Sequence, residues 1–318
     1  MNLNKIILSL QSSLASDWEA TQTLLGQPQQ HALHLIQAMG SHIERGKQLR
    51  PLLVLTIGTI LGGCQRSHHL LAAVVEILHC ATLLHDDVID EAPKRHHQLS
   101  AWQEHGNKAS ILVGDYFFAQ AFRWIAAIGD PQVITSLADA TQVIVAGEVQ
   151  QHQVSQQLDL TEATYFSIIH AKTAELFKQA CFLSSVLSNA SPSVQQACHD
   201  FGEAIGLAFQ LQDDLLDYTS EVSGKTLGQD WSEGKTTYPV IIAYKYPKYR
   251  QALIDARETN APISSVIEIL TSANAFEQTA QHVEQQIQRA RTALNSLPSH
   301  PHSHYLFNLL ETMVQRVY

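Results

Sequence analysis

The chain has 318 residues, of which 45 % are hydrophobic and 16 % are charged, and this length and composition allow a large buried core. Its 30 acidic and 20 basic residues give a formal net charge of −10. That excess of negative charge argues against binding to nucleic acid or to an anionic membrane, since both need a positive surface. The four cysteines form no closely spaced pair, so we expect neither a disulfide framework nor a zinc site, and a reducing compartment fits.

No segment has the pattern of a membrane anchor or a secretion signal. Residues 1–19 reach Asp17 and Glu19 without a sustained apolar stretch, which is typical of a helix and not of a signal peptide. The longest apolar run, residues 52–64, is interrupted by glycine and threonine and is too short to span a bilayer. We therefore expect a cytoplasmic protein without a transmembrane segment.

Apolar residues recur at intervals of three and four along the whole chain, and no segment alternates with a period of two. Asp130-Pro131 and Ser191-Pro192 each place a capping residue before a proline, as at the start of a helix. The pattern predicts an all-α protein, a single domain over residues 1–318 folded as a bundle of about ten to thirteen helices. The predicted helices lie near residues 3–24, 29–44, 50–62, 67–91, 100–128, 131–153, 161–189, 192–219, 236–246, 263–273, 275–296 and 303–316.

A cluster of carboxylates closes an otherwise apolar predicted helix. Asp86 and Asp90 are one turn apart, and Asp87 lies three residues before Asp90, so the three side chains share one face. Like charges repel at this spacing, and the negative end of the helix dipole adds a second penalty. A bound cation relieves both. Oxygen ligands without cysteine favour Mg²⁺ or a similar ion.

The same spacing recurs at the end of a second apolar helix, as Asp213, Asp214 and Asp217. Asp86, Asp87 and Asp90 are called the first acidic motif below, and this trio the second. One such cluster can be a solvated helix end, but two copies in a chain of low charge density favour a shared metal site. Two facing motifs can hold several Mg²⁺ ions together with an anionic ligand, most naturally a diphosphate.

A diphosphate also requires cations that are not paired with these aspartates. Basic residues lie close to the motifs in sequence, and three of the lysines stand beside a glycine, which permits close approach of the backbone to a ligand. Each of them taken singly could equally be an ordinary surface charge. The candidates are Lys47, Arg50, Lys94, Arg95, Lys172, Lys225 and Lys235.

With these motifs in place, the chain resembles the trans-isoprenyl (polyprenyl) diphosphate synthases, and most of all their bacterial long-chain members. The resemblance extends from about Leu33 to Val317. It is carried by Gly46-Lys47-x-x-Arg50-Pro51, His79, Leu84-His85-Asp86-Asp87-Val88-x-Asp90-Glu91, Gly106-Asn107-Lys108, Gly114-Asp115, Gly147-Glu148, Lys172-Thr173, Phe209-Gln210-x-x-Asp213-Asp214-x-x-Asp217 and Gly224-Lys225-x-x-Gly228-x-Asp230-x-x-Glu233-Gly234-Lys235.

The resemblance implies a helical bundle around a central cavity, a homodimer, and Mg²⁺-dependent condensation of an allylic diphosphate with isopentenyl diphosphate. By the same likeness, all six aspartates of the two motifs act on a cluster of about three Mg²⁺ ions, and Lys172 serves catalysis. The implied ligands of the allylic diphosphate are Arg95, Lys172, Thr173, Gln210, Lys225 and Lys235. Those of isopentenyl diphosphate are Lys47, Arg50 and His79, with His96 at a further family position.

The residues before the first acidic motif bear on the length of the product. Side chains at intervals of three and four before Asp86 would line a tunnel, and these include Ala81 and Ile77. In the family, bulky aromatic side chains four or five residues before the first aspartate limit the product, whereas this chain has Thr82 and Ala81 there. We therefore expect a product longer than twenty carbons, with an octaprenyl-like chain for quinone side chains as the implied case.

One position departs from the family pattern. The family usually has Arg-Arg-Gly after the first acidic motif, whereas this chain has Arg95-His96-His97. Histidine is only partly charged at neutral pH and lacks the guanidinium fork. We expect weaker binding of isopentenyl diphosphate, improving toward acid pH as His96 becomes protonated.

Other functions remain open at this stage. A shorter-chain farnesyl or geranylgeranyl diphosphate synthase, or a degenerate paralogue of low activity, would keep most of these motifs. A class I terpene cyclase shares the fold and the first acidic motif but usually has a different second one. A metal phosphohydrolase built on His85-Asp86 leaves the second motif unexplained, and non-catalytic subunits of heteromeric synthases tend to lose the aspartates.

Overall fold

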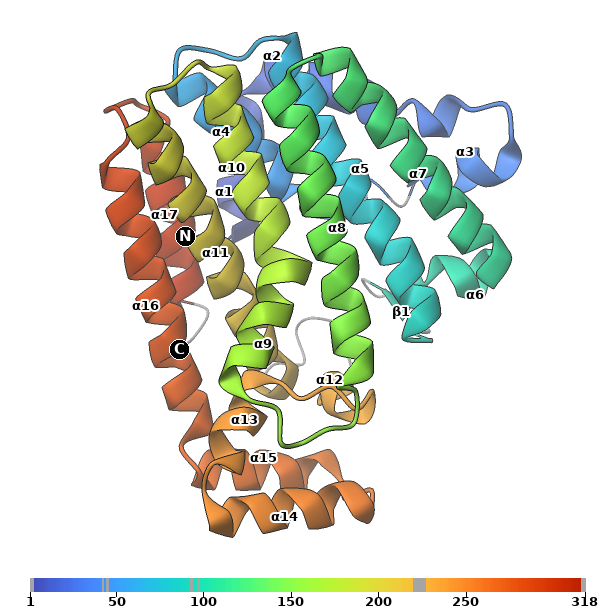
Figure 1. Ribbon diagram of the computed structural model, residues 1–318, viewed down its shortest axis with the longest axis vertical. Helices are drawn as coiled ribbons and strands as arrows, with labels where there is room; N and C mark the ends of the chain where they lie inside the picture. The colour runs from blue at the N-terminus through green and yellow to red at the C-terminus, as the bar shows by residue number, and fades with distance from the viewer. Residues whose placement is uncertain are drawn as a thin grey trace.

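The computed structural model describes residues 3–41, 43, 46–91, 94–95, 98–219 and 227–315, and helices dominate them (Figure 1). The prediction of an all-α fold is confirmed. In chain order the α-helices are α1 (Leu3–Ser13), α2 (Ala15–Leu25), α3 (His34–Gly40), α4 (Leu49–Ile60), α5 (Arg66–Ile89), α6 (Ala101–His105), α7 (Asn107–Ile128), α8 (Pro131–Gln153), α9 (Glu162–Ile169), α10 (Glu175–Leu187), α11 (Pro192–Thr219), α12 (Gln229–Ser232), α13 (Tyr238–Tyr244), α14 (Pro247–Glu258), α15 (Ile263–Ser272), α16 (Ala275–Asn295) and α17 (Ser303–Gln315). Short additional elements are the 3₁₀-helix η1 (Pro28–Gln30), the π-helical turn η3 (His170–Ala174) and the strands β1 (Lys94–Arg95) and β2 (Gln98–Leu99).

The most apolar helices form the centre of the bundle. Nearly every residue of α4 and most of α5 are buried, because their sequences are apolar on all sides and leave no face for water. The helix α5 packs against α4, α7 and α10, while α11 packs against α10 and α16. The two helices that end in acidic motifs, α5 and α11, are thus held rigidly inside the bundle.

Within the described ranges, two helices, α5 and α7, are long and apolar enough to cross a membrane by length and composition. The apolar window of α5 is 72 % buried inside the bundle, as expected of a core helix, whereas that of α7 is only 39 % buried. The remainder of α7 faces outward and includes exposed apolar side chains such as Phe122.

The described residues contain more helical segments than the ten to thirteen predicted. The predicted helix 3–24 is divided at Leu14, and 100–128 is divided at Gly106, whose φ of 86° an ordinary residue rarely adopts. The segment 161–189 is a helix only if the π-helical turn η3 in its middle is included. The helices α12 and α14 were not predicted at all. The sequence of α14 is too polar to show a clear apolar stripe, since Leu253 and Ala256 are its only buried residues.

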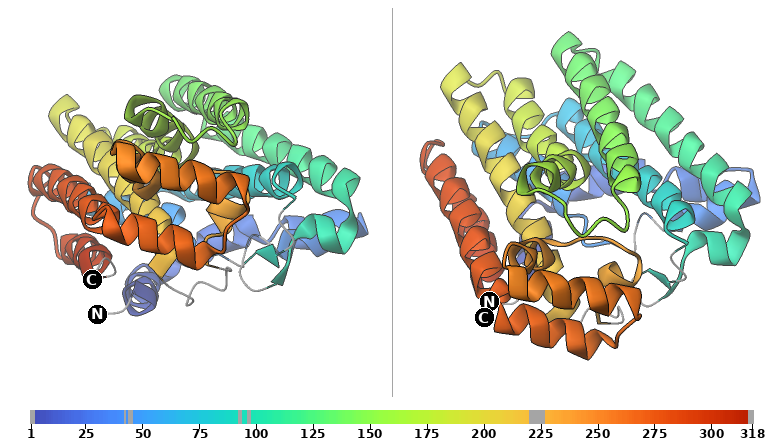
Figure 2. Two further views of the ribbon diagram at one scale, coloured as in Figure 1. Left: turned by 90° about the horizontal axis from the view of Figure 1, so that it is seen from below. Right: turned by 60° about the horizontal axis from the view of Figure 1, so that its bottom comes forward.

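The C-terminal helices α14 and α15 lie across the lower end of the bundle (Figures 1 and 2). There they are close to α12 and to the connection between α8 and α9. This end of the molecule also carries the C-terminal end of α11, where the second acidic motif lies.

Candidate functional site

Both acidic motifs lie on the last turns of long buried helices. In the first motif, Asp86 and Asp90 are half-buried, whereas Asp87 is buried. Asp90 also caps α5, because its N–H donates to the Asp86 carbonyl. In the second motif, Asp213 is exposed, whereas Asp214 and Asp217 are buried.

Lys235 shows that the two motifs face one site. It follows α12, yet its Nζ lies 2.6 Å from Asp90 Oδ2 of the first motif and 2.8 Å from Glu233 Oε2. Burial works to lower the pKa of Lys235, but Asp90, Asp230 and Glu233 together raise it above its usual value. An ammonium group held this way joins the end of α5 to the segment that follows α11.

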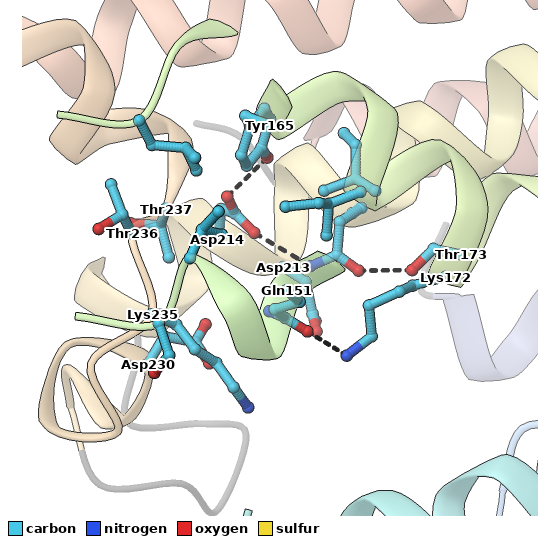
Figure 3. A pocket seen from close by; sticks show the side chains of 16 residues that line it. Gln151, Tyr165, Lys172, Thr173, Asp213, Asp214, Asp230, Lys235, Thr236 and Thr237 are labelled. Carbon is cyan, nitrogen blue, oxygen red and sulfur yellow. Dashed lines mark hydrogen bonds between the residues drawn. The ribbon is translucent and has the colours of Figure 1, made fainter. Parts of the chain in front are cut away.

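A pocket opens beside this bridge, and Asp213, Asp214 and Lys235 line it. Figure 3 shows Lys235 and Asp230 on one side of the pocket and Lys172 and Thr173 on the other. The side chains of Asp213 and Asp214 lie between them. The pocket thus has anionic and cationic walls, together with an apolar part formed by residues such as Ile168 and Ile169.

The carboxylate of Asp214 is fully engaged with the protein. Its Oδ2 accepts from the Tyr165 hydroxyl at 2.7 Å and from the Tyr238 N–H at 2.9 Å, and its Oδ1 accepts from Gln210 Nε2 at 3.0 Å. Burial, followed by the charge of Asp230, raises the pKa of Asp214 to about 7 despite these donors. Gln210 in turn accepts from the Thr173 hydroxyl at 2.8 Å, so Asp214 orients two residues of the pocket wall.

Asp217 faces the backbone of α12. Its carboxylate accepts from the N–H groups of Gln229 and Asp230 at 3.1 and 3.2 Å, and its carbonyl accepts from the Gly228 N–H at 2.7 Å. An aspartate at a helix start satisfies donors that the helix leaves open. In this structure Asp217 therefore fixes the segment that carries Lys235.

Lys172 and Thr173 lie in the π-helical turn η3, which widens the helix opposite α8. Lys172 Nζ lies 2.7 Å from Glu148 Oε2 on α8 and also donates to Gln151. Gly147 permits this approach, because a Cβ there would lie only 2.5 Å from the Cβ of Ala171.

The expectation that the cations of the site stand apart from the aspartates is wrong for Lys235, which pairs with Asp90. Glu233 and Asp90 are the acceptors within its reach, and a largely buried ammonium needs such partners. Lys172 is likewise paired, although with Glu148 of α8 and not with a motif aspartate.

The proposed second diphosphate site is at the start of α4. Lys47 is exposed, and the Arg50 guanidinium lies 4.3 Å above the Phe177 ring. Burial lowers the pKa of Arg50 to about 10, while the nearby Glu76 counteracts this effect. Burial also raises the pKa of Glu76 to about 7. His79 is half-buried one turn after Glu76.

Some of the predicted site residues lie wholly or partly outside the described residues. His96 and Lys225 lie outside the described residues, and of Arg95 only the backbone, in β1, is described. The product-length residues are placed: Ile77 and Ala81 are fully buried in α5, and Thr82 is half-buried. None of these three lines the described pocket.

The donor set fits Mg²⁺ bound together with phosphate. Among the described residues, no group of three or more His, Cys, Asp or Glu side chains could hold a metal ion unaided. Mg²⁺ typically takes one or two carboxylates and completes its shell with water and phosphate oxygens. The half-buried Asp86 and the exposed Asp213 suit that arrangement, and Asp90 shares its Oδ2 with Lys235. The buried Asp214 and Asp217 carboxylates are occupied further, since each accepts at least two hydrogen bonds from the protein.

Sequence reasoning assigned no role to several residues of this site. Tyr165, Gln151, Thr236, Thr237 and Tyr238 were not singled out, because each is an ordinary residue within its own helix or loop. Glu148, Asp230 and Glu233 were noted only as parts of motifs. Their spacing from the lysines in the sequence gives no sign of the contacts that they make in the fold.

The described helical bundle thus has one aspartate-rich motif that lines the pocket and a second that is joined to it by the ion pair between Asp90 and the pocket residue Lys235. The model of the family described as "Polyprenyl synthetase" matches residues 33–271, and the chain belongs to this family. It is an enzyme family of prenyltransferases that depend on Mg²⁺.

Similar proteins cover the whole chain. Octaprenyl diphosphate synthase of Escherichia coli is 34 % identical over 99 % of each chain. A crystal structure of a decaprenyl diphosphate synthase from Rhodobacter capsulatus has a TM-score of 0.92 and 36 % identity, covering 98 % of this chain and 99 % of its own. A polyprenyl synthase from Caulobacter crescentus, complexed with calcium and isoprenyl diphosphate, has a TM-score of 0.91 and 33 % identity, with 98 % of each chain covered.

Proposed function

We propose that this enzyme condenses an allylic diphosphate with isopentenyl diphosphate to make a long trans-polyprenyl diphosphate. The observation that carries the proposal is the bridge from Lys235 to Asp90 beside a pocket lined by Asp213. It brings two acidic helix ends and a cation to one place, as a bound metal–diphosphate group requires.

The roles follow from position. Asp86, Asp90 and Asp213 would hold the metal cluster, with three Mg²⁺ ions as the expected number, while Asp87, Asp214 and Asp217 complete the two motifs. When bound, Mg²⁺ neutralises charge that develops on the departing diphosphate. The allylic diphosphate would contact the residues Arg95, Lys172, Thr173, Gln210, Lys225 and Lys235.

The second substrate would bind at the start of α4. Lys47, Arg50 and His79 would hold the diphosphate of isopentenyl diphosphate, with His96 as a further contact. The flat guanidinium of Arg50 stacks on Phe177, and a guanidinium can donate two parallel hydrogen bonds to phosphate oxygens.

The proposed reaction needs groups that stabilise negative charge on the diphosphate and apolar side chains that keep water away from the carbocation. Breaking the allylic C–O bond leaves a carbocation and an anionic diphosphate, and Lys172 and Lys235 are placed to bind the anion. Apolar side chains such as Ile168 and Ile169 exclude water that would otherwise capture the cation. The alkene of isopentenyl diphosphate then attacks the cation, and the released diphosphate would accept the proton that the new cation loses.

A long product is supported by both the helix α5 and the relatives. Ala81 is small and Thr82 is not aromatic, so neither side chain would close a product tunnel behind Asp86. Two of the three similar proteins named above are an octaprenyl and a decaprenyl diphosphate synthase. Quinone side chains would be the destination of such a product, and farnesyl or geranylgeranyl diphosphate is the shorter alternative.

We also propose a homodimer, formed through the outer faces of α7 and α8. These two adjacent helices expose large apolar side chains that water would otherwise contact. On α7 and α8 they are Ile111, Leu112, Phe122, Ile134, Val143, Val145 and Val149. A cytoplasmic location fits the four free cysteines.

The test is incubation with Mg²⁺, farnesyl diphosphate and labelled isopentenyl diphosphate, followed by chromatography of the dephosphorylated products. The proposal expects labelled polyprenols longer than twenty carbons, and none when Mg²⁺ is chelated. A cyclic hydrocarbon without label would identify a terpene cyclase. Absence of any labelled product from this incubation would contradict the proposal.

A further inference from the structure

The segment Gly228–Lys235 carries the lysine that joins the two acidic motifs, and it is held at its start by Asp217. Its end has a different support. The Lys235 N–H donates to the Asp230 carbonyl at 2.8 Å, which makes the segment a tight turn. The position of the Lys235 side chain therefore depends on what the turn rests against.

The connection between α8 and α9 holds the turn from one side. Gly234 has a φ of 79°, and a Cβ at this position would lie 1.9 Å from Gln156 Nε2. The Gln156 N–H donates to the Gly234 carbonyl at 2.9 Å, and the Thr236 hydroxyl donates to the Gln157 carbonyl at 2.8 Å. Gln156 itself has a φ of 70°, so two left-handed residues meet here.

Arg257 of α14 lies outside the pocket and contacts both the turn and Gln156. Its Nη1 donates to the Trp231 carbonyl at 2.9 Å and to Gln156 Oε1 at 3.3 Å. Its guanidinium lies 3.7 Å from the centre of the Trp231 ring. Arg257 Nε and Nη2 are buried without hydrogen-bond partners, and stacking on the indole is favourable for a guanidinium that is buried in this way.

The next helix supports the other end of the turn. A Cβ at Gly228, which has a φ of 70°, would lie 2.0 Å from Ile263 Cδ1 at the start of α15. The pair α14 and α15 therefore contacts the segment that carries Lys235 at two points, Gly228 and Trp231. Figure 2 shows these helices lying across the end of the bundle where α11 ends.

We propose that Arg257 is a positioning residue for Lys235. It joins the Trp231 carbonyl to Gln156, fixes the turn between them, and so places the Lys235 ammonium opposite Asp90. The consequence for ligand binding rests on the proposed function, in which Lys235 contacts the allylic diphosphate. Arg257 lines no part of the described pocket and acts only through the turn.

The test compares Arg257→Met with Arg250→Met on the same helix. Arg250 is a matched control, because it also stacks on a ring, that of Tyr244 at 5.1 Å, and donates to a carbonyl, that of Tyr244 at 3.1 Å. The first readout is hydrogen exchange at the amides of residues 230–236 in the protein without ligand. The second is the affinity for inorganic pyrophosphate in the presence of Mg²⁺, measured by calorimetry.

We expect faster exchange at these amides and about tenfold weaker pyrophosphate binding in Arg257→Met, and neither change in Arg250→Met. Arg257→Lys should recover part of the affinity, since it keeps one donor for the Trp231 carbonyl. Unchanged pyrophosphate affinity in Arg257→Met, or an equal loss in both Met variants, would overturn the proposal. Loss of pyrophosphate affinity in Arg257→Met alone would support the positioning role of Arg257. A wild-type protein that made no polyprenol would count against the proposed function and would leave this result intact.

Discussion

At the scale of single residues, the three aspartates of the second acidic motif have different environments. Asp213 is exposed toward the pocket, Asp214 accepts three hydrogen bonds inside the protein, and Asp217 holds the start of α12. The sequence predicts the two trios from spacing alone. It could not separate these environments, because the donors come from Tyr165 and Tyr238 on other helices.

Ala81 allows a direct test of the proposed product tunnel. Ala81 is fully buried in α5, five residues before Asp86. An aromatic side chain in its place should fill space that a growing product chain would need. We expect Ala81→Phe to shorten the main product, and Ala81→Val to do so less. Chromatography of the polyprenols measures this. An unchanged length distribution in an active Ala81→Phe enzyme would contradict the tunnel assignment.

Glu203 makes a stability contribution that depends on pH. A hydrogen bond from His170, and a further one from Arg289, lower the pKa of Glu203 from 4.5 to about 2. The folded-state pKa lies below the unfolded one, so the stabilisation is complete above about pH 4.5 and is lost as the pH falls toward 2. Solvent exposure reduces it to about 1 kcal/mol.

Urea unfolding at pH 7 and at pH 3.5 checks this. Glu203→Gln should lower the free energy of unfolding at pH 7, and the difference from wild type should shrink at pH 3.5. The exposed Asp200 on the same helix serves as the control, and Asp200→Asn should change little at pH 7. A Glu203→Gln difference that stays constant or grows at low pH would be evidence against the assigned hydrogen bonds.

At the scale of elements, periodicity predicts the long buried helices well. It places α5, α8 and α11 within a few residues, because their apolar residues recur over many turns and proline or capping residues mark two of the starts. The π-helical turn η3 and the polar helix α14 have no such signal. Both matter to the site, since η3 carries Lys172 and α14 carries Arg257.

The crossing of α8 with η3 gives a prediction at this scale. Gly147→Ala would place a Cβ 2.5 Å from the Cβ of Ala171, so η3 must shift and Lys172 with it. We expect a higher KM for the allylic diphosphate, by about tenfold. The double variant Gly147→Ala with Ala171→Gly removes the colliding atom and should restore most of the wild-type KM. Failure of this rescue would show that the crossing does not position Lys172.

At the scale of the whole molecule, the sequence predicts the fold class, because apolar periodicity and family motifs agree along most of the chain. The sequence does not show which apolar helix faces stay exposed to solvent in the folded chain. The structure shows this for α7 and α8, where exposed apolar side chains such as Phe122 and Val145 interrupt an otherwise polar surface.

The proposed dimer follows from that face. Val145 is 50 % exposed, and a lysine there would bring a charge into an apolar interface. We expect Val145→Lys to sediment as a monomer where the wild type sediments as a dimer. Leu8 on α1 is 64 % exposed, and Leu8→Lys is the control that should stay dimeric. A monomeric wild type would reject the proposed interface.

The proposed function requires a single metal–diphosphate site shared by α5 and α11. Calorimetric titration of inorganic pyrophosphate, with and without Mg²⁺, tests this in the wild type, Asp90→Asn and Asp213→Asn. We predict that binding needs Mg²⁺ and that each substitution alone weakens it by at least about tenfold, because both helix ends contact one ligand complex. Binding that is independent of Mg²⁺, or that is lost in only one of the two variants, would contradict the shared site.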